Sequence, residues 1–96
     1  MQWQESANQI TLHDEDGTLV GEITFPTVNE AQNRVVVERT FVNPAYRGQG
    51  IAQELVARFV NYADQHHYQV KLMCPYAQDQ FDQHPEYQHL LVSPTN

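Results

Sequence analysis

One stretch of the chain repeats its apolar residues with the period of an amphipathic helix, and this pattern limits the possible folds more than any other feature. The apolar residues recur every three to four positions: Ile51, Ala52, Leu55, Val56, Phe59, Val60 and Ala63. Polar and charged residues fill the gaps. The pattern predicts a helix that begins at Gly48 or Gln49, ends at Gln65 and covers a sheet with its apolar face.

The segments on both sides of this helix have the composition of strands. Residues 34–42 are rich in β-branched side chains, and Asn43-Pro44 ends the run. Residues 69–74 form a short apolar run that Pro75 ends. Because a helix joins the two runs, their order predicts a parallel pair of strands connected by a right-handed crossover.

The rest of the chain adds a hairpin before this unit and helical turns after it. Two alternating runs, 10–12 and 19–25, flank an acidic turn that contains Gly17. This arrangement predicts an antiparallel hairpin that ends at Pro26. Residues 76–91 predict one or two short helices, with the last five residues as a tail.

Length and charge narrow the classes of function. At 96 residues the chain has the size of one domain, so a single α/β domain over residues 1–96 is expected. Twelve acidic residues against five scattered basic ones give a net charge of −7, which disfavours nucleic acid as a partner. A cationic substrate suits this charge, although solubility alone also accounts for it.

Cysteine content and hydropathy favour a cytoplasmic protein without membrane contact. The single cysteine, Cys74, cannot form an internal disulfide, and no segment reaches the roughly 18 apolar residues of a membrane span. The N-terminus lacks the basic-then-apolar pattern of a signal peptide. In the cytoplasm an isolated thiol is either buried and inert or used chemically.

Two glycines at the start of the predicted helix can hold an anion. Gly48 and Gly50 permit backbone conformations closed to other residues, and the free N–H groups of the following helix point to the same place. The pattern lacks the Lys and Ser or Thr of a P-loop and the third glycine of a dinucleotide site, so ATP and NAD are poor ligands. Spacing alone leaves two interpretations open, a pyrophosphate site and a plain tight turn.

The residues around these glycines match a known signature. Residues 42–52 read Val-Asn-Pro-Ala-Tyr-Arg-Gly-Gln-Gly-Ile-Ala. This segment resembles the acetyl-coenzyme A motif Gln/Arg-x-x-Gly-x-Gly/Ala of the GNAT acetyltransferase superfamily, with a departure at Ala45, where the motif has Gln or Arg. The resemblance implies acetyl-coenzyme A or coenzyme A as the cosubstrate, bound by Arg47, Gly48, Gln49, Gly50, Ile51 and Ala52.

Later motifs resemble a compact GNAT subgroup. Cys74-Pro75-Tyr76 follows the second strand run, and His84-Pro85-Glu86-Tyr87 precedes the pair Leu90-Leu91. Together with the glycine segment, residues 47–52, the similarity covers about residues 34–91. One departure is Arg39, which stands where the subgroup usually has His. The resemblance implies a GNAT-like fold, in which a mostly antiparallel sheet has one parallel crossover and its splayed strands form a V-shaped cofactor cleft.

The resemblance also implies roles for individual residues. Backbone groups of Phe41 and Val42 would contact the pantetheine arm, and Cys74 would lie near the thioester. There the thiol would accept the acetyl group or assist proton transfer, and the alternative is a small buried residue that fills the strand end. Tyr76 and Tyr87 are candidates for the general acid, with Tyr76 preferred, or else are core residues with their hydroxyls at the surface.

Other polar residues have weaker claims. His84 is a candidate base for the incoming amine but fits better as a helix cap. Glu38 is a candidate base acting through a water, although a solvated strand carboxylate is the default. The histidines at positions 66, 67, 84 and 89 fit no metal-binding spacing, so no metal site is predicted.

These observations favour an N-acetyltransferase that moves an acetyl group from acetyl-coenzyme A to a primary amine, directly or through Cys74. The acceptor is either a small molecule or a protein lysine, and the sequence leaves the oligomeric state open. A non-catalytic coenzyme A-binding module is an alternative, because Arg39 replaces the expected His. An acidic protein-interaction domain without a cofactor is a second alternative, in which Gly48 and Gly50 form only a turn.

Overall fold

The computed structural model describes residues 1–92. In this range the elements follow one another as β1 (Gln2–Ser6), β2 (Gln9–His13), β3 (Leu19–Thr24), β4 (Thr27–Asn29), β5 (Arg34–Val37), β6 (Arg39–Val42), the 3-10 helix η1 (Pro44–Tyr46), α1 (Ile51–Gln65), β7 (Gln69–Leu72), α2 (Pro75–Gln83) and the 3-10 helix η2 (Pro85–Leu90). Neither α-helix in this part of the chain is long and apolar enough to cross a bilayer.

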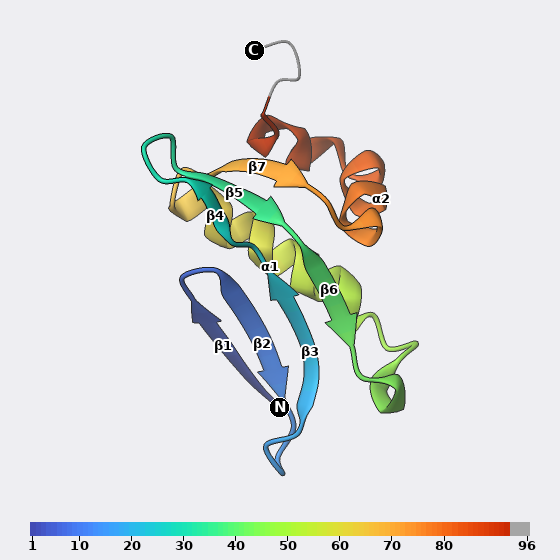
Figure 1. Cartoon of the computed structure of the whole chain (residues 1–96). Helices are drawn as coiled ribbons and strands as arrows, with labels where there is room; N and C mark the ends of the chain where they lie inside the picture. Colours follow the sequence, from blue (N-terminus) through green and yellow to red (C-terminus); the bar gives the residue numbers. More distant parts are fainter. Residues whose placement is uncertain (93–96) are drawn as a thin grey trace.

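The strands form two sheets (Figure 1). The chain passes from one sheet to the other between β3 and β4 and again between β5 and β6. One sheet has the order β1-β2-β3-β6 and is antiparallel throughout. The other has the order β4-β5-β7, in which β4 and β5 are antiparallel and β5 and β7 are parallel. The predicted α/β fold with mostly antiparallel strands and one parallel crossover through α1 is therefore confirmed.

The strand predicted over residues 34–42 is two strands, and the prediction of one continuous element was wrong. β5 pairs with β7, whereas β6 pairs with β3, and the change of partner falls at Glu38. There the Glu38 amide donates to Thr24, while the Val37 carbonyl accepts from the amides of Met73 and Cys74. Beyond Val37, β6 and β7 lead to different sheets and open the V-shaped gap between them (Figure 1).

Helix α1 covers one face of the four-stranded sheet with the apolar stripe that its sequence predicts. The buried residues on the helix are Ile51, Leu55, Val56, Phe59, Val60 and Ala63. Phe59 packs against Phe25, with ring centroids 4.8 Å apart. The helix ends at Gln65 as predicted but begins later, at Ile51, because Gly48 and Gly50 have positive φ angles that an α-helix excludes.

Two short strands, β1 and β4, were not predicted. Both are rich in polar residues and largely exposed, so neither shows a clear alternation of apolar and polar side chains. β1 is held at the sheet edge by pairing with β2, and the Arg58 guanidinium of α1 lies 3.9 Å from the centroid of the Trp3 ring. Tertiary contacts, rather than local pattern, determine these strands.

The C-terminal region contains the short helices that the sequence predicts for residues 76–91. The strand predicted over residues 69–74 is β7, which ends at Leu72, two residues before the predicted boundary. Helix α2 begins directly after Cys74. Of the predicted tail, only Val92 lies within the described residues, and the other four positions fall outside them. Cys74 therefore lies between the end of β7 and the start of α2.

Gly21 allows α1 to lie close to the sheet. A Cβ added at this position would lie 3.0 Å from Leu55 Cδ1, 3.1 Å from Ile51 Cγ2 and 3.2 Å from the Phe41 carbonyl oxygen. Replacement by Ala should therefore push the helix away from β3 and lower the free energy of unfolding by roughly 1–3 kcal/mol. Urea denaturation measures this loss, and an unchanged unfolding midpoint would contradict the packing argument.

Candidate functional site

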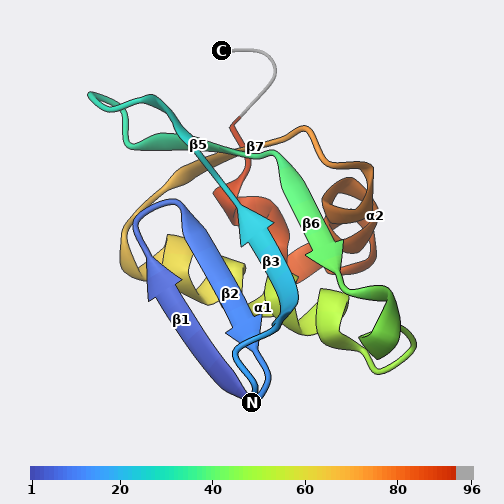
Figure 2. The same cartoon turned by 60° about the horizontal axis from the view of Figure 1, so that its bottom comes forward.

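The pocket with the clearest functional geometry lies between the end of β6 and the start of α1. Figure 2 shows where these two elements lie. Its volume is about 610 Å³, which is within the usual range for ligand sites. The lining residues come from β6, the connecting loop, the first turn of α1 and the start of α2: Thr40, Val42, Tyr46, Arg47, Gly48, Gly50, Ile51, Ala52, Gln53 and Tyr76. The V-shaped gap and the glycine segment thus belong to one cleft.

The glycine segment has the geometry of an anion site. Gly48 and Gly50 have φ angles of +84° and +78°, and Gly50 is the N-cap residue of α1. Cβ atoms added at either position would meet nothing within 4 Å, so the backbone surface is open toward the pocket. The N–H groups of the first turn of α1 have no partners within the helix and carry its positive dipole end. These features fit a phosphate-bearing ligand.

The loop before the glycines is fixed by side chains that bridge to the β2–β3 turn. Asn43 donates through Nδ2 to the Leu19 carbonyl at 3.0 Å and accepts from the Ala45 amide at 3.0 Å. The Tyr46 hydroxyl donates to Asp14 Oδ2 at 2.8 Å. This bond is the main cause that lowers the pKa of Asp14 and raises the pKa of Tyr46, so the two groups stay in the matching charge states at neutral pH.

Cys74 lies between β7 and α2 and is not itself among the residues that line the pocket. It is the N-cap residue of α2 and is 6% exposed. Its Sγ lies 3.5 Å from Thr40 Oγ1, across the gap between the strands. Burial raises the pKa of the thiol, but hydrogen bonds from the Thr40 hydroxyl and from the backbone amides of Ala77, Tyr76 and Thr40 together lower it below its ordinary value. These hydrogen bonds favour the thiolate form.

Tyr76 brings a proton donor to the same cleft. It is partly buried and lines the pocket. Burial is the main cause that raises the pKa of its hydroxyl, and the charges of Asp79 and Cys74 raise it further. The Tyr76 hydroxyl is therefore protonated at neutral pH and suited to donate a proton.

Two residues expected at the cofactor site do not line the pocket. Phe41 faces the opposite side of the sheet, where the Arg39 guanidinium carbon lies 4.9 Å from the centroid of its ring. Gln49 belongs to the glycine segment but is not among the lining residues. Arg39, which stands at the position of the subgroup's His, shares the outer face with Phe41, because side chains alternate along β6.

The sequence interpretation missed three lining residues: Thr40, Tyr46 and Gln53. Strand alternation places Thr40 on the same face as Val42 and could have identified it. Tyr46 lies within the recognised signature, but nothing local identifies Asp14 as its partner. Gln53 extends the glycine segment by one residue into the first turn of α1.

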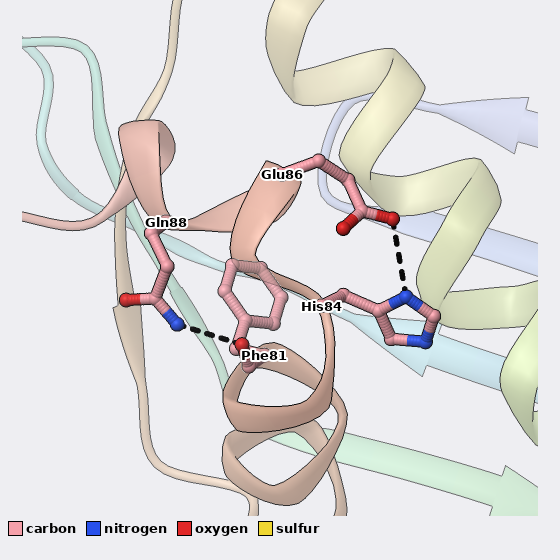
Figure 3. Close-up of polar contacts among 4 residues, drawn as sticks. All are labelled: Phe81, His84, Glu86 and Gln88. Atoms are coloured by element: carbon pink, nitrogen blue, oxygen red, sulfur yellow. Dashed lines mark hydrogen bonds and ion pairs between the residues drawn. The ribbon is translucent and has the colours of Figure 1, made fainter.

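The His-Pro-Glu-Tyr motif lies at the end of α2 and holds that helix (Figure 3). His84 Nδ1 lies 3.2 Å from Glu86 Oε2, and its ring stacks on Tyr87 with centroids 4.7 Å apart. Gln88 Nε2 donates to the Phe81 carbonyl at 2.6 Å, which satisfies an acceptor at the C-terminal end of the helix. None of these residues lines the pocket, so the motif supports α2 from the end opposite Cys74.

The remaining candidates lie apart from the cleft. Glu38 is exposed at the junction of β5 and β6. His89 Nε2 contacts Asp64 Oδ1 at 2.6 Å on the surface, and this contact is the main cause that raises the pKa of His89. Within residues 1–92 no three metal-binding side chains come together.

The comparison that decides the family is with sequence profiles. The profile of the family described as GCN5-related N-acetyl-transferase matches residues 9–90. The chain belongs to this family. It is therefore a GNAT protein, and the acyltransferase character that the cleft suggests is the character of its family. None of the curated proteins matches the chain.

Solved structures share the GNAT fold. A GCN5-like protein from Staphylococcus aureus has a TM-score of 0.75 and 21% identity, over 96% of this chain and 88% of that one. A GNAT family N-acetyltransferase from Escherichia coli, in complex with CoA, has a TM-score of 0.63 and 24% identity, over 76% of this chain and 43% of that one. The Mycobacterium tuberculosis protein Rv2747, also in complex with CoA, has a TM-score of 0.63 and 21% identity, over 81% of this chain and 47% of that one. This GNAT chain thus spans most of the first structure but less than half of the other two.

Proposed function

We propose that this GNAT protein transfers an acetyl group from acetyl-coenzyme A to a primary amine. The observation that carries the proposal is the cleft, where the glycine segment lines one pocket together with Thr40, whose hydroxyl oxygen lies 3.5 Å from the sulfur of Cys74. The CoA complexes of the structural neighbours from Escherichia coli and Mycobacterium tuberculosis support coenzyme A as the ligand.

The cofactor-binding residues are those of the glycine segment and the open side of β6. The backbone amides from Gly48 to Ala52 bind the pyrophosphate, and the positive end of the α1 dipole adds to the attraction. Arg47 donates from Nε to the Val42 carbonyl at 3.3 Å and adds a positive charge at the pocket wall. The pantetheine arm lies along Val42 and Thr40, whose side chains line the pocket.

The proposed chemistry uses Cys74 as nucleophile and Tyr76 as acid. The Cys74 thiolate attacks the thioester carbonyl carbon, a new carbon–sulfur bond forms, and the bond to the coenzyme A sulfur breaks. The leaving thiolate takes a proton from the Tyr76 hydroxyl. A neutral amine then attacks the carbonyl carbon of the acetyl-cysteine, its nitrogen loses a proton to the Tyr76 phenolate, and the carbon–sulfur bond breaks, so that the amide forms and the Cys74 thiolate and the Tyr76 hydroxyl are restored. Tyr76 lines the pocket, and the sulfur of Cys74 lies 3.5 Å from the hydroxyl oxygen of Thr40, which also lines it.

The acceptor is proposed as an amine that approaches from the open side of the V-shaped gap. A cationic molecule suits a chain with a net charge of −7, since long-range attraction favours its approach. Both a small polyamine-like molecule and an exposed protein lysine have this character. A panel that contains both classes is therefore needed.

Titration with acetyl-coenzyme A tests the binding step. The amide resonances of residues 47–52 should shift and saturate, while those of β1 should not. Release of free thiol in the presence of an amine panel then tests turnover. Saturable binding with no turnover on any amine and no acetylated protein would favour a non-catalytic coenzyme A-binding module. Unmoved amides at residues 47–52 would overturn the proposal as a whole.

Tyr46→Phe tests how the Asp14 contact supports the anion site. Loss of the hydroxyl frees the loop before Gly48 and should weaken coenzyme A binding about fivefold. Tyr87→Phe is the matched control, because Tyr87 lies outside the pocket. Calorimetric titration of the two variants measures the difference, and equal affinities would show that the contact has no part in binding.

The same contact predicts a pH dependence. Because the pKa of Asp14 is lowered in the folded chain, the contact is complete above the ordinary aspartate pKa and is lost as the pH falls through the lowered value. The raised pKa of Tyr46 keeps its hydroxyl protonated at neutral pH. The affinity difference between the wild type and Tyr46→Phe should therefore be full at neutral pH and shrink in acid.

A further inference from the structure

Thr40 links β6 to the segment between β7 and α2 through a contact with the sulfur of Cys74. It lies in β6 opposite Ile23 of β3, on the face that α1 covers, and its side chain lines the pocket. β6 is not paired with β7, so no ladder of backbone hydrogen bonds joins the two strands there. The contact between Thr40 Oγ1 and Cys74 Sγ, at 3.5 Å, crosses this gap.

Both partners of this contact are held by their own backbones. The amide of Cys74 donates to the Val37 carbonyl at 3.0 Å, which fixes the residue at the point where the strands part. Thr40 belongs to a strand paired with β3, and its β-branched side chain has few rotamers. The hydroxyl and the sulfur therefore meet because the fold places them together, and little side-chain freedom is lost when the contact forms.

The polar groups around the sulfur are donors rather than charges. The sulfur contacts the Thr40 hydroxyl, and hydrogen bonds with this hydroxyl and with the backbone of Ala77, Tyr76 and Thr40 lower the pKa of the thiol. Tyr76 is the titratable neighbour on α2, and Asp79 on the same helix acts on Tyr76. Arg39 lies over Phe41 on the other face of β6, and Lys71 of β7 is exposed. The hydroxyl is thus the side-chain donor among the groups that contact the sulfur.

We propose that Thr40 is a positioning residue for acetyl transfer, which holds the sulfur of Cys74 beside the pocket wall that Thr40 lines and donates a hydrogen bond from its hydroxyl group to the thiolate. The role rests on the proposed transfer through Cys74. In the neutral thiol the S–H group donates to Thr40 Oγ1, and in the thiolate the direction of the bond reverses, so the hydroxyl stabilises the charged form. Thr40 forms no bond to the acetyl group in this scheme and acts only through Cys74.

The test is the pH dependence of Cys74 alkylation by iodoacetamide, in Thr40→Val and Thr40→Ser and without any cofactor. Val keeps the branched shape but has no hydroxyl, so its alkylation midpoint should rise by about one pH unit, with alkylation at neutral pH slowed up to about tenfold. Ser keeps the donor and should stay near the wild type. The chain has one cysteine, so the reaction reports on Cys74 alone.

The same variants are then incubated with acetyl-coenzyme A and followed by intact mass. Acetylation of Thr40→Val should be slowed at neutral pH and should recover as the pH rises, whereas Thr40→Ser should react as the wild type does. Amide spectra establish that each variant is folded, and Thr40→Ala replaces the Val variant if that variant is not. A Val or Ala variant with the wild-type alkylation midpoint overturns the inference, and so does a Ser variant as impaired as Val.

The two arms separate this inference from the function on which it rests. If the wild type is never acetylated at Cys74 but the alkylation midpoint of Thr40→Val still rises, the covalent route is wrong and the effect of Thr40 on the thiolate is confirmed. If the wild type is acetylated and Thr40→Val reacts at the same rate at every pH, the covalent route stands and the role of Thr40 is wrong.

Discussion

Cys74→Ser is expected to abolish covalent acetylation of the chain and to lower amine acetylation at neutral pH by about a hundredfold or more. The physical reason is the environment of the sulfur, where four hydrogen-bond donors favour the thiolate despite its burial. A serine hydroxyl in the same place remains protonated at neutral pH and is a weak nucleophile. Intact mass after incubation with acetyl-coenzyme A, together with thiol release in the presence of an amine, measures both effects.

Two features of the chain make this experiment easy to interpret. Cys74 is the only cysteine in the sequence, so an acetyl group that hydroxylamine removes as a thioester must lie there. Ser is close to Cys in size, and the position is 6% exposed, so the fold should be kept. Titration of coenzyme A to the Ser variant gives the control, since the anion site is unchanged. A wild type without added acetyl and a Ser variant of equal activity would leave direct attack by the amine as the route.

Gly48→Ala is expected to weaken coenzyme A binding by about tenfold or more, which corresponds to at least about 1.4 kcal/mol. The φ angle of +84° suits glycine, and an added methyl group would occupy the surface that the pyrophosphate must approach. Calorimetric titration with coenzyme A measures the affinity. Nothing in the protein lies within 4 Å of the added Cβ. The loss of affinity is therefore expected from contact between the methyl group and the ligand and from backbone strain, not from clashes within the protein.

Gly17→Ala is the matched control for this strain. Gly17 has a φ angle of +82°, its added Cβ also meets nothing within 4 Å, and it lies in the β2–β3 turn outside the pocket. Both variants should lose about 1 kcal/mol of stability in urea denaturation, because each forces Ala into a left-handed conformation. Only Gly48→Ala should lose affinity. Equal affinities in the two variants would mean that the glycine segment forms a turn and does not bind the ligand.

The sequence predicts the parts of this protein that depend on local pattern. The apolar period from Ile51 to Ala63 reappears as the buried face of α1, and the β-branched runs around it reappear as strands. The glycines at positions 48 and 50 have positive φ angles, as expected both of an anion-binding segment and of a plain tight turn. In each case neighbouring residues in the chain carry enough information to define the local structure.

The parts that the sequence does not predict depend on remote partners. Residues 34–42 continue as strand-forming residues through Glu38, and only the different neighbours β7 and β3 divide them into two strands. Thr40 contacts the sulfur of Cys74, which lies 34 positions away in the sequence. Tyr46 donates a hydrogen bond to the carboxylate of Asp14, which lies 32 positions away. Polar strands such as β1 form because a hydrogen-bonding edge is available beside them. Local pattern contains none of these distances.

The parallel pairing of β5 with β7 also determines when the cleft can exist during folding. Val35 pairs with Val70, so the closing contact encloses β6, the glycine segment and the whole of α1. Contacts of this separation pay a loop-closure entropy before they gain any stability, and they form late. A chain that emerges from the ribosome as far as α1 already has every amide proposed to bind phosphate but has neither β7 nor Cys74. The nascent chain therefore has no thiol with which to react until the last strand of the parallel pair has been made.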